Sequence, residues 1–142
     1  MQAAEDPRPQ ARRTPPASRL LLDIGGEGRY RGAWNLNPRR WRTCGPLRGH
    51  PIPNWLPGRA ECIPLPAGSV QTIIVERTPL RPAALREIRR VAAPGARVLL
   101  RHAWRPGSDP HRLAREILGP PLHVSLRVMT MLVVQQSVFC LP

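Results

Sequence analysis

The sequence predicts an α/β fold built on a mostly parallel sheet with an antiparallel edge at its carboxyl-terminal end. Two short aliphatic runs, residues 19–24 and 70–75, have the apolar character of strands that are covered on both faces. Helix signals separate the later strands, and the chain closes on two strand-like stretches with no helix between them. This order of elements is typical of a doubly wound sheet with an antiparallel pair added at one edge.

The first expected strand, residues 19–24, runs directly into a glycine-rich turn. Glycine removes the side chain where backbone amides must approach a ligand, and it permits positive φ. A second short strand is expected at residues 33–36. The segment between them, residues 29–32, is too short for the helix that usually joins two parallel strands. The glycines of the turn are Gly25, Gly26 and Gly28.

Residues 39–59 are rich in glycine and proline and show no helix signal. Trp41 and Trp55 in this stretch have two interpretations: they anchor the coil on the sheet, or they form walls of a ligand pocket. A third short strand is expected at residues 60–63, ahead of the turn that leads into the strand at residues 70–75.

A first helix is expected at residues 82–92. Pro82 suits its first turn, and an apolar face recurs at every third residue while arginines and a glutamate point outward. Pro94 and Gly95 end the helix, and the next strand follows at residues 96–103. The apolar face consists of Leu85, Ile88 and Val91.

A second helix is expected at residues 110–118, with Asp109 as its N-cap and Gly119 just past its end. Leu113 and Ile117 should face the core. The chain then closes on two strands, at residues 123–128 and 132–141, which are expected to pair antiparallel at the edge of the sheet.

The chain of 142 residues is expected to form one domain. Residues 1–17 are rich in proline and arginine without periodicity and are expected to be a disordered basic arm, so the folded domain covers residues 18–142. No segment approaches the ~18 apolar residues of a membrane span, and the start lacks the apolar stretch of a secretory signal. We therefore expect a cytoplasmic protein that does not enter membranes.

Cysteine and histidine give no sign of a disulfide framework or a metal site. The three cysteines are odd in number and widely spaced, so free, buried thiols are expected. The four histidines show no metal-ligand spacing, and no metal is expected. The cysteines are Cys44, Cys62 and Cys140, and the histidines are His50, His102, His111 and His123.

The chain carries a formal net charge of +13, all of its cationic side chains are arginines, and its pI is about 11.8. Such a balance favours polyanions, because each arginine that contacts a phosphate releases counterions. The alternative is that arginine without lysine reflects a GC-rich genome, with the charges spread over solvated faces. We favour the alternative, because no arginine cluster is interleaved with aromatic side chains as single-strand binding requires.

Three stretches together resemble class I S-adenosylmethionine-dependent methyltransferases. DIGGEG at residues 23–28 resembles motif I of that family. IPLPAGSVQTIIVE at residues 63–76 resembles the stretch from the adenine-side loop into the fourth strand. LREIRRVAAPGARVLLRHAW at residues 85–104 resembles the helix, Pro-Gly turn and fifth strand that follow. In register, the three motifs are much more specific than any one of them.

The resemblance implies a Rossmann-like sheet and S-adenosyl-L-methionine as cofactor. It implies that Asn37 takes the place of the acid that grips the ribose, although an amide lacks the charge-assisted pair of a carboxylate. Each implied site residue also has a structural interpretation: a strand exit for the glycines, a turn residue for Asn37, an ion pair for Glu76. The other implied cofactor contacts are Asp23, Gly25, Gly26 and Gly28 for the methionine moiety, Glu61, Cys62 and Ile63 for the adenine, and Glu76, Arg77 and Thr78 near the transferred methyl.

Glu76 and His102 are the candidate catalytic residues. Glu76 ends the fourth expected strand, where the resemblance places the transferred methyl. His102 ends the fifth and is a candidate general base, because the pKa of histidine lies near working pH. The competing interpretation of His102 is a merely solvated histidine.

The helices that follow the first two strands in the family are missing, which leaves one face of the sheet poor in helices. A parallel strand that is apolar on both sides would then expose a patch larger than monomers tolerate. We expect a homodimer through the helix-poor sheet face, with a heterologous partner as the alternative.

Three functions remain open. The first is a minimal methyltransferase acting on an unidentified acceptor, expected to be a small molecule. The second is a catalytically inactive methyltransferase-like subunit or regulator that acts through dimerisation. The third is a basic nucleic-acid-binding module, which would use Arg8, Arg12, Arg13, Arg39, Arg40, Arg42 and Arg48.

Overall fold

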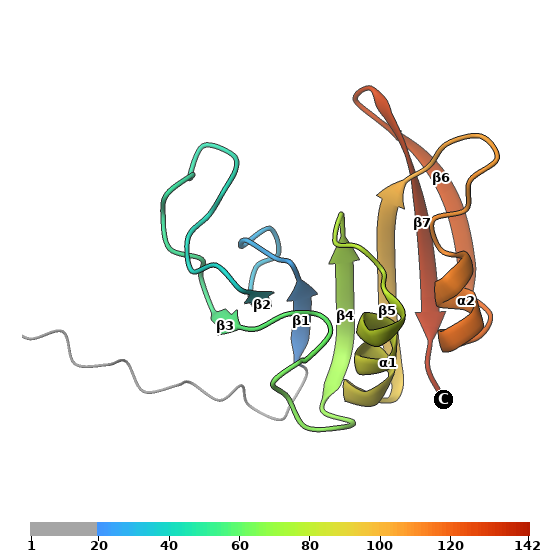
Figure 1. The fold of residues 1–142 in the computed structure, drawn as a ribbon, viewed down its shortest axis with the longest axis horizontal. Coiled ribbons are helices and arrows are strands. Elements are labelled where there is room, and N and C mark those ends of the chain that lie inside the picture. Colours follow the sequence, from blue (N-terminus) through green and yellow to red (C-terminus); the bar gives the residue numbers. More distant parts are fainter. Residues whose placement is uncertain (1–19) are drawn as a thin grey trace, which may run out of the picture.

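A computed structural model describes residues 20–142, and the arm expected at residues 1–17 lies outside them. The chain forms one seven-stranded sheet with the strand order β3-β2-β1-β4-β5-β7-β6 (Figure 1). The strands are β1 (Leu21–Ile24), β2 (Trp34–Asn37), β3 (Trp55–Pro57), β4 (Val70–Glu76), β5 (Ala92–Ala103), β6 (His123–Met129) and β7 (Leu132–Cys140). The helices are α1 (Pro82–Val91) and α2 (Arg112–Leu118).

The expected mostly parallel sheet with an antiparallel edge is confirmed. Strands β1 to β5 pair in parallel, and β7 runs antiparallel to both of its neighbours, β5 and β6. The chain builds outward from β1 through β2 to β3, then returns to the other side of β1 to form β4. The sheet therefore has a topological switch point between β1 and β4, the place where open α/β sheets bind ligands.

Alternation along the strands gives the sheet two different faces. On one face Leu22, Ile73 and Val98 lie in neighbouring strands and pack in the same core as Leu85 and Ile88 of α1. We call this the helix-covered face, because both helices pack on it (Figure 1). Asp23 and its paired neighbours point to the opposite, helix-free face.

Helix α1 forms where its apolar spacing predicts it. Leu85, Ile88 and Val91 are fully buried, and Arg89 and Arg90 in the last turn suit the negative end of the helix dipole. The helix ends at Val91, one residue earlier than expected. Pro94 and Gly95 lie inside β5, where the register with β4 shifts, so they form an irregularity at the start of the strand.

The expected N-cap of α2 is wrong. The helix begins at Arg112 with His111 as the capping residue, and no side chain caps it. The Asp109 carboxylate instead accepts the amide of His111 at 3.0 Å, so it closes the turn that precedes the helix. Gly119 ends the helix with a φ of 94°, as expected.

The third strand is also misplaced in the sequence analysis. Residues 60–63, where it was expected, form a turn in which the Cys62 amide donates to Arg59 O at 3.0 Å. Strand β3 lies earlier because the Trp55 indole N–H donates to Asn37 O at 2.8 Å and the Asn35 amide donates to Asn54 O at 3.0 Å. These contacts with β2 are tertiary and have no local signature.

The helix-free face is polar rather than apolar where it ends beside the switch point. Four polar side chains point to it: Asp23, Asn35, Glu76 and Arg101. The apolar side chain of Ile74 lies on the same face but is only 6% exposed. Within residues 20–142, the large exposed hydrophobic side chains lie elsewhere, on the 38–54 loop and around the β6–β7 hairpin. They are Trp41, Leu47, Leu122, Val124, Leu126, Val128, Met129, Met131 and Leu132. A homodimer through the helix-free face stays a prediction, without the apolar patch that motivated it.

The cysteines are free but not buried, so the expectation of buried thiols is wrong. Cys44 lies in the 38–54 loop, Cys62 in the turn after β3, and Cys140 alternates with the buried Phe139 at the end of β7. In residues 20–142, no three His, Cys, Asp or Glu side chains gather where they could hold a metal ion. The same residues contain no helix long and apolar enough to cross a membrane.

Candidate functional site

A pocket of about 230 Å³ lies at the carboxyl ends of β1, β2 and β4, at the topological switch point. Its apolar wall comes from the helix-covered face, and its rim carries one carboxylate and two guanidinium groups. The pocket is lined by Ile24, Gly25, Leu36, Pro38, Gly58, Arg59, Ala60, Glu61, Thr78, Pro79 and Arg81.

Three of the predicted cofactor residues line this pocket: Gly25, Glu61 and Thr78. They come from three segments far apart in the sequence, the turn after β1, the segment after β3 and the segment after β4. Glu61 pairs with Arg81 across the rim at 3.6 Å. The structure thus brings together one predicted residue from each part of the implied site.

The neighbouring predictions on the adenine side lie outside the pocket lining. Ile63 is 3% exposed and belongs to the hydrophobic core, while Cys62 is exposed to solvent. The Ile63 amide donates to the Glu87 carboxylate of α1 at 2.8 Å. These contacts hold the segment after β3 against α1 and so fix one side of the pocket.

Close packing explains why the turn after β1 is made of glycine. Gly25 has a φ of +73°, and a Cβ there would overlap the Thr78 hydroxyl. A Cβ on Gly26 would overlap the side chains of Asn35 and Asp23. Larger residues at either position would force the turn away from the ends of β2 and β4.

The amides of the three glycines are bonded within the protein. Gly25, Gly26 and Gly28 all donate to acceptors in or next to β1 and β2. In that order, the acceptors are Leu36 O at 2.8 Å, Asp23 O at 3.2 Å and Asn35 Oδ1 at 3.0 Å. The Glu27 amide has no acceptor within residues 20–142. The turn is therefore a pre-formed, largely self-satisfied structure.

Asn37 closes the other side of the turn with its side chain. Its Nδ2 donates to Gly26 O at 3.2 Å, and its Oδ1 accepts the Arg39 amide at 2.9 Å. The residue is only 8% exposed. Where the resemblance implies a ribose contact, Asn37 ties the glycine turn to the end of β2.

Asp23 and Glu76 belong to a charged cluster on the helix-free face. Arg29 bridges them, at 3.1 Å from Asp23 and 3.2 Å from Glu76. Glu76 also accepts the Tyr30 hydroxyl and pairs with Arg101 at 2.9 Å. Arg29, Tyr30 and Arg101 thus surround the two carboxylates on the face that lacks helices, at the carboxyl ends of β1, β4 and β5.

Burial and charge act in opposite directions in this cluster. Burial raises the pKa of Asp23 despite the neighbouring Arg29. Burial also opposes ionisation of Glu76, but the Tyr30 hydrogen bond and the charges of Arg29 and Arg101 outweigh it and lower the pKa of Glu76. Burial and the Glu76 carboxylate raise the pKa of Tyr30 to about 12. Glu76 is thus an ionised, fully engaged acceptor.

His102 heads a hydrogen-bonded chain into the core. Its Nε2 lies 2.7 Å from Thr78 O, its Nδ1 lies 3.0 Å from His111 Nε2, and His111 Nδ1 lies 2.7 Å from Ser137 Oγ. Since a carbonyl only accepts, Nε2 of neutral His102 must carry the proton. Its Nδ1 then accepts from His111, and His111 Nδ1 accepts from the Ser137 hydroxyl.

His102 and His111, the two histidines of this hydrogen-bonded series, are both uncharged near pH 7. Burial lowers the pKa of His102, and burial together with His102 lowers the pKa of His111 to about 4. Neutral His102 has no free ring nitrogen, because one donates to Thr78 and the other accepts from His111. His102 instead holds the backbone carbonyl of Thr78, a residue that lines the pocket.

The backbone conformation of Arg77 and the contact of Arg42 with the glycine turn were not predicted. Arg77, between Glu76 and Thr78, has a left-handed φ of 60°, which a bulky residue rarely adopts. Arg42 lies against the glycine turn, since a Cβ on Gly28 would be 2.9 Å from Arg42 Nη2, and its buried Nε has no partner among residues 20–142. Neither a backbone angle nor a contact across the 38–54 loop leaves a local pattern in the sequence.

The comparisons with known proteins give structural matches only. No protein-family model matches the chain, and no curated protein matches its sequence. The structure of the antibiotic-resistance methyltransferase Kmr is 15% identical over 88% of both chains, with a TM-score of 0.57. Burkholderia thailandensis 1,6-didemethyltoxoflavin-N1-methyltransferase, solved with S-adenosylhomocysteine, is 12% identical over 85% of this chain and 70% of that one, with a TM-score of 0.61.

A third match is a variant of the 16S rRNA (adenine(1408)-N(1))-methyltransferase from Catenulisporales acidiphilia, solved with its cosubstrate SAM. It is 18% identical over 88% of this chain and 85% of that chain, with a TM-score of 0.54. Likeness at this level of identity defines the fold. The chain has the fold of class I S-adenosylmethionine-dependent methyltransferases, reduced to two helices in residues 20–142.

Proposed function

We propose that this protein binds S-adenosylmethionine in the pocket at the switch point and transfers its methyl group to an acceptor. The observation that carries the proposal is the convergence of Gly25, Glu61 and Thr78 on one pocket at the carboxyl ends of β1, β2 and β4. When bound, the cofactor supplies a methyl group on a positively charged sulfur, and the protein mainly has to orient the acceptor.

The pocket suits the nucleoside part of the cofactor. Ile24, Leu36 and Ala60 give it an apolar wall, and the Glu61 carboxylate gives its rim an acceptor for hydroxyl groups. At about 230 Å³ it is smaller than the ~300–1,000 Å³ of most ligand pockets. The amino-acid end of the cofactor would therefore lie outside it, along the glycine turn.

Arg42 and the Glu27 amide are the groups we propose for the carboxylate of that amino-acid end. Glu27 lies within the glycine turn, and Arg42 reaches the turn from the 38–54 loop, where its Nη2 would be 2.9 Å from a Cβ on Gly28. Both have a donor without a partner in the described residues. A guanidinium and a backbone N–H are the usual partners of a carboxylate. The glycine amides themselves are already bonded.

Glu76 and His102 stay predictions as catalytic residues, and their contacts support positioning roles. Glu76 holds Tyr30, Arg29 and Arg101 over the helix-free face. His102 holds the carbonyl of Thr78, whose side chain lines the pocket. Both residues would shape the site without moving a proton themselves.

A second candidate is a methyltransferase-like subunit without cofactor. It is favoured by the internal bonding of the turn, because Asn37 and all three glycine amides have their partners within the protein. A carboxylate in the place of Asn37 would compete better for ribose hydroxyls than an amide does.

Calorimetric titration with S-adenosylmethionine and S-adenosylhomocysteine separates the two candidates. We expect saturable binding that weakens roughly tenfold in Glu61→Gln, since a charge-assisted hydrogen bond contributes ~1.5–3 kcal/mol. The matched control is Glu116→Gln, which changes a 59% exposed glutamate of α2 in a comparable ion pair and should bind like the wild type. No heat at millimolar ligand would leave only the inactive subunit.

The acceptor, the oligomeric state and the location in the cell stay predictions. Light scattering tests the homodimer through the helix-free face, and a compact monomer at micromolar concentration would contradict it. A small-molecule acceptor is tested by incubating the protein and labelled cofactor with a metabolite extract freed of macromolecules. Label that is recovered only on macromolecules from an untreated extract would contradict it.

A further inference from the structure

The loop between β2 and β3, residues 38–54, belongs to a stretch with an extreme charge imbalance. Residues 28–60 contain seven arginines and no aspartate or glutamate. Of these seven arginines, only Arg29 forms an ion pair within residues 20–142, with Asp23 and Glu76. The remaining arginines therefore have no ionic partner in the described part of the protein. They are Arg31, Arg39, Arg40, Arg42, Arg48 and Arg59.

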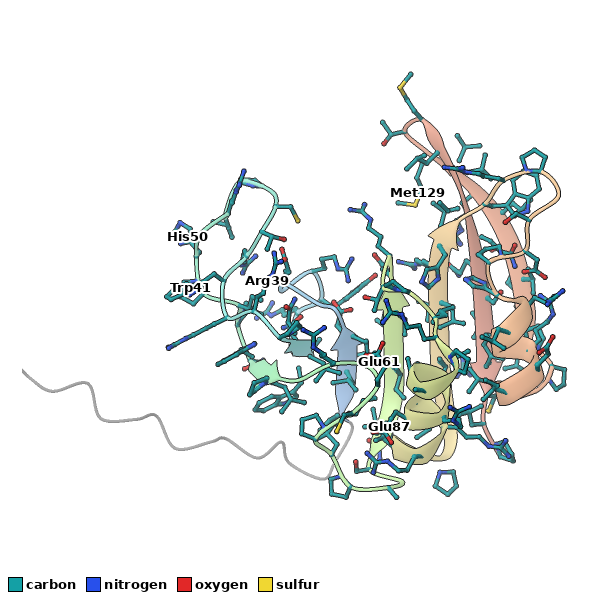
Figure 2. All side chains as sticks on the ribbon, in the orientation of Figure 1. Arg39, Trp41, His50, Glu61, Glu87 and Met129 are labelled. Carbon is teal, nitrogen blue, oxygen red and sulfur yellow. The ribbon has the colours of Figure 1, made fainter. Side chains whose placement is uncertain are left out.

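An exposed aromatic ring lies among these arginines. Trp41 is 52% exposed, and the Arg40 guanidinium lies 5.5 Å from its ring centroid and 6.0 Å from that of Trp55. Figure 2 shows Trp41 and His50 on the outer side of the loop, away from the sheet. The sequence around it, Arg39 to Arg42, is an interleaved Arg-Arg-Trp-Arg cluster. The expectation that no such cluster exists is wrong.

The loop presents these side chains on an ordered backbone. The Arg42 amide donates to His50 O at 2.9 Å, and the Ile52 amide donates to Arg40 O at 2.8 Å. Ile52 is 4% exposed and anchors the loop, while Trp55 is held by its indole N–H on Asn37 O. Arg40 and Trp41 thus lie on a backbone that these hydrogen bonds hold in place, and the Trp41 ring faces solvent.

We propose that this loop binds single-stranded nucleic acid. Arg39, Arg40 and Arg48 would contact phosphates, and the exposed face of Trp41 would stack on a base. Free arginines around an exposed aromatic ring are the combination that tracks a single strand, because every base has a face that can stack. A polyanion without bases would use the arginines and leave Trp41 unused.

The inference is independent of the proposed cofactor pocket. Pro38 lines that pocket and opens the loop, so a bound strand would pass beside the pocket. Trp41, Arg39, Arg40 and Arg48 do not line it. Variants of these residues therefore separate the two proposals, because cofactor binding should survive in them.

Fluorescence anisotropy with labelled oligo-U and oligo-dT, of about 15 nucleotides, tests the proposal, with heparin as the polyanion without bases. We expect Trp41→Ala to weaken oligonucleotide binding roughly tenfold and to leave heparin binding within twofold of the wild type. Trp41→Phe keeps an aromatic face and should recover most of the loss. Circular dichroism and cofactor titration of both variants check that the fold is intact.

The salt dependence tests the arginines. Combined replacement of Arg39, Arg40 and Arg48 by alanine should reduce the slope of log affinity against log salt by about 2, at ~0.7 per lost phosphate contact. The control is Arg86→Ala, an exposed α1 arginine without an ion pair in residues 20–142, which should bind like the wild type. The proposal would be overturned if Arg86→Ala lost as much oligonucleotide affinity as a single alanine variant of Arg39, Arg40 or Arg48. Oligonucleotide binding that Trp41→Ala leaves unchanged would also overturn it.

Discussion

The two halves of the sheet are held together by different forces. Around β4, β5 and β7, apolar side chains pack under α1 and α2, and Ile88, Val98 and Phe139 are fully buried. Around β1, β2 and β3, Leu22, Ile24 and Leu36 extend the same apolar core, but buried polar side chains also bond to backbone and to each other. Asn35, Asn37 and Asp23 are buried polar residues with partners in the turn after β1.

This difference follows from the missing helices and bears on the site. Where no helix covers a sheet, the protein buries polar groups and must satisfy them with hydrogen bonds and ion pairs. The pocket lies on the boundary between the two halves, with Gly25 and Leu36 on one side and Thr78 on the other. Changes in each half should therefore have different energetic signatures.

The largest expected effect comes from the helix-packed half. Ile88→Ala removes a fully buried side chain from α1 and should lower the free energy of unfolding by about 3–5 kcal/mol, including the cavity that it leaves. Leu36→Ala in the other half should cost about 1 kcal/mol less, because Leu36, although buried, lines the pocket and so has empty space on one side already. Urea unfolding of both variants measures this difference, and equal losses would contradict it.

A second effect follows from the buried histidine His111. His111 is fully buried with a pKa of about 4, against an ordinary value of 6.5. As the pH falls below 6.5, the unfolded chain binds a proton that the folded chain does not, so stability should fall by roughly 3 kcal/mol between pH 6.5 and 4. This contribution is fully present above pH 6.5. Asp109, Arg115 and His102 are the charged or titratable groups near His111.

His111→Gln separates this effect from the rest of the acid titration. An amide can still bond to Ser137 and His102 but does not titrate, so the variant should lose much less stability than the wild type between pH 6.5 and 4. Unfolding curves at several pH values provide the comparison. A variant with the same pH dependence as the wild type would show that His111 does not cause the loss.

The smallest of the three effects concerns the charged cluster on the helix-free face. Arg29→Met leaves the fully buried Asp23 without its cation and should cost roughly 1–3 kcal/mol at pH 7. Burial already raises the pKa of Asp23 in the folded state, and loss of Arg29 raises it further. The cost should therefore be smaller at acid pH, where Asp23 binds a proton, and grow as the pH rises through the folded pKa.

Arg31→Met is the control for this variant. Arg31 is exposed, lies two residues from Arg29 and has no ion pair within residues 20–142. Its replacement should change stability by less than ~0.5 kcal/mol. If both variants lose the same amount, the Asp23 pair does not stabilise the helix-free face.

The sequence predicts the elements whose cause is local and misses those whose cause is tertiary. The spacing of Leu85, Ile88 and Val91 is enough to predict α1, because one helix face must be apolar to pack on the sheet. Strand β3 depends on hydrogen bonds from Trp55 and Asn35 to distant backbone, so its position was wrong. The cap of α2 was wrong because Asp109 bonds two residues ahead instead of capping the helix.

The site divides in the same way. Motif spacing predicted Gly25, Glu61 and Thr78, which do converge on the pocket. It could not show that Asn37 bonds to Gly26 or that His102 bonds to His111, since those partners depend on the folded chain. The Arg-Trp-Arg cluster at residues 40–42 was visible in the sequence, but only the structure shows that Trp41 is exposed and can contact a ligand.

Amide NMR spectra during titration with S-adenosylhomocysteine test the central proposal most directly. If the switch-point pocket holds the cofactor, the largest shifts should occur at Gly25, Glu61 and Thr78, with smaller ones at Glu27 and Arg42. The amides of the β6–β7 hairpin should not move. Unchanged spectra at millimolar ligand, or shifts centred on that hairpin, would contradict the proposed pocket.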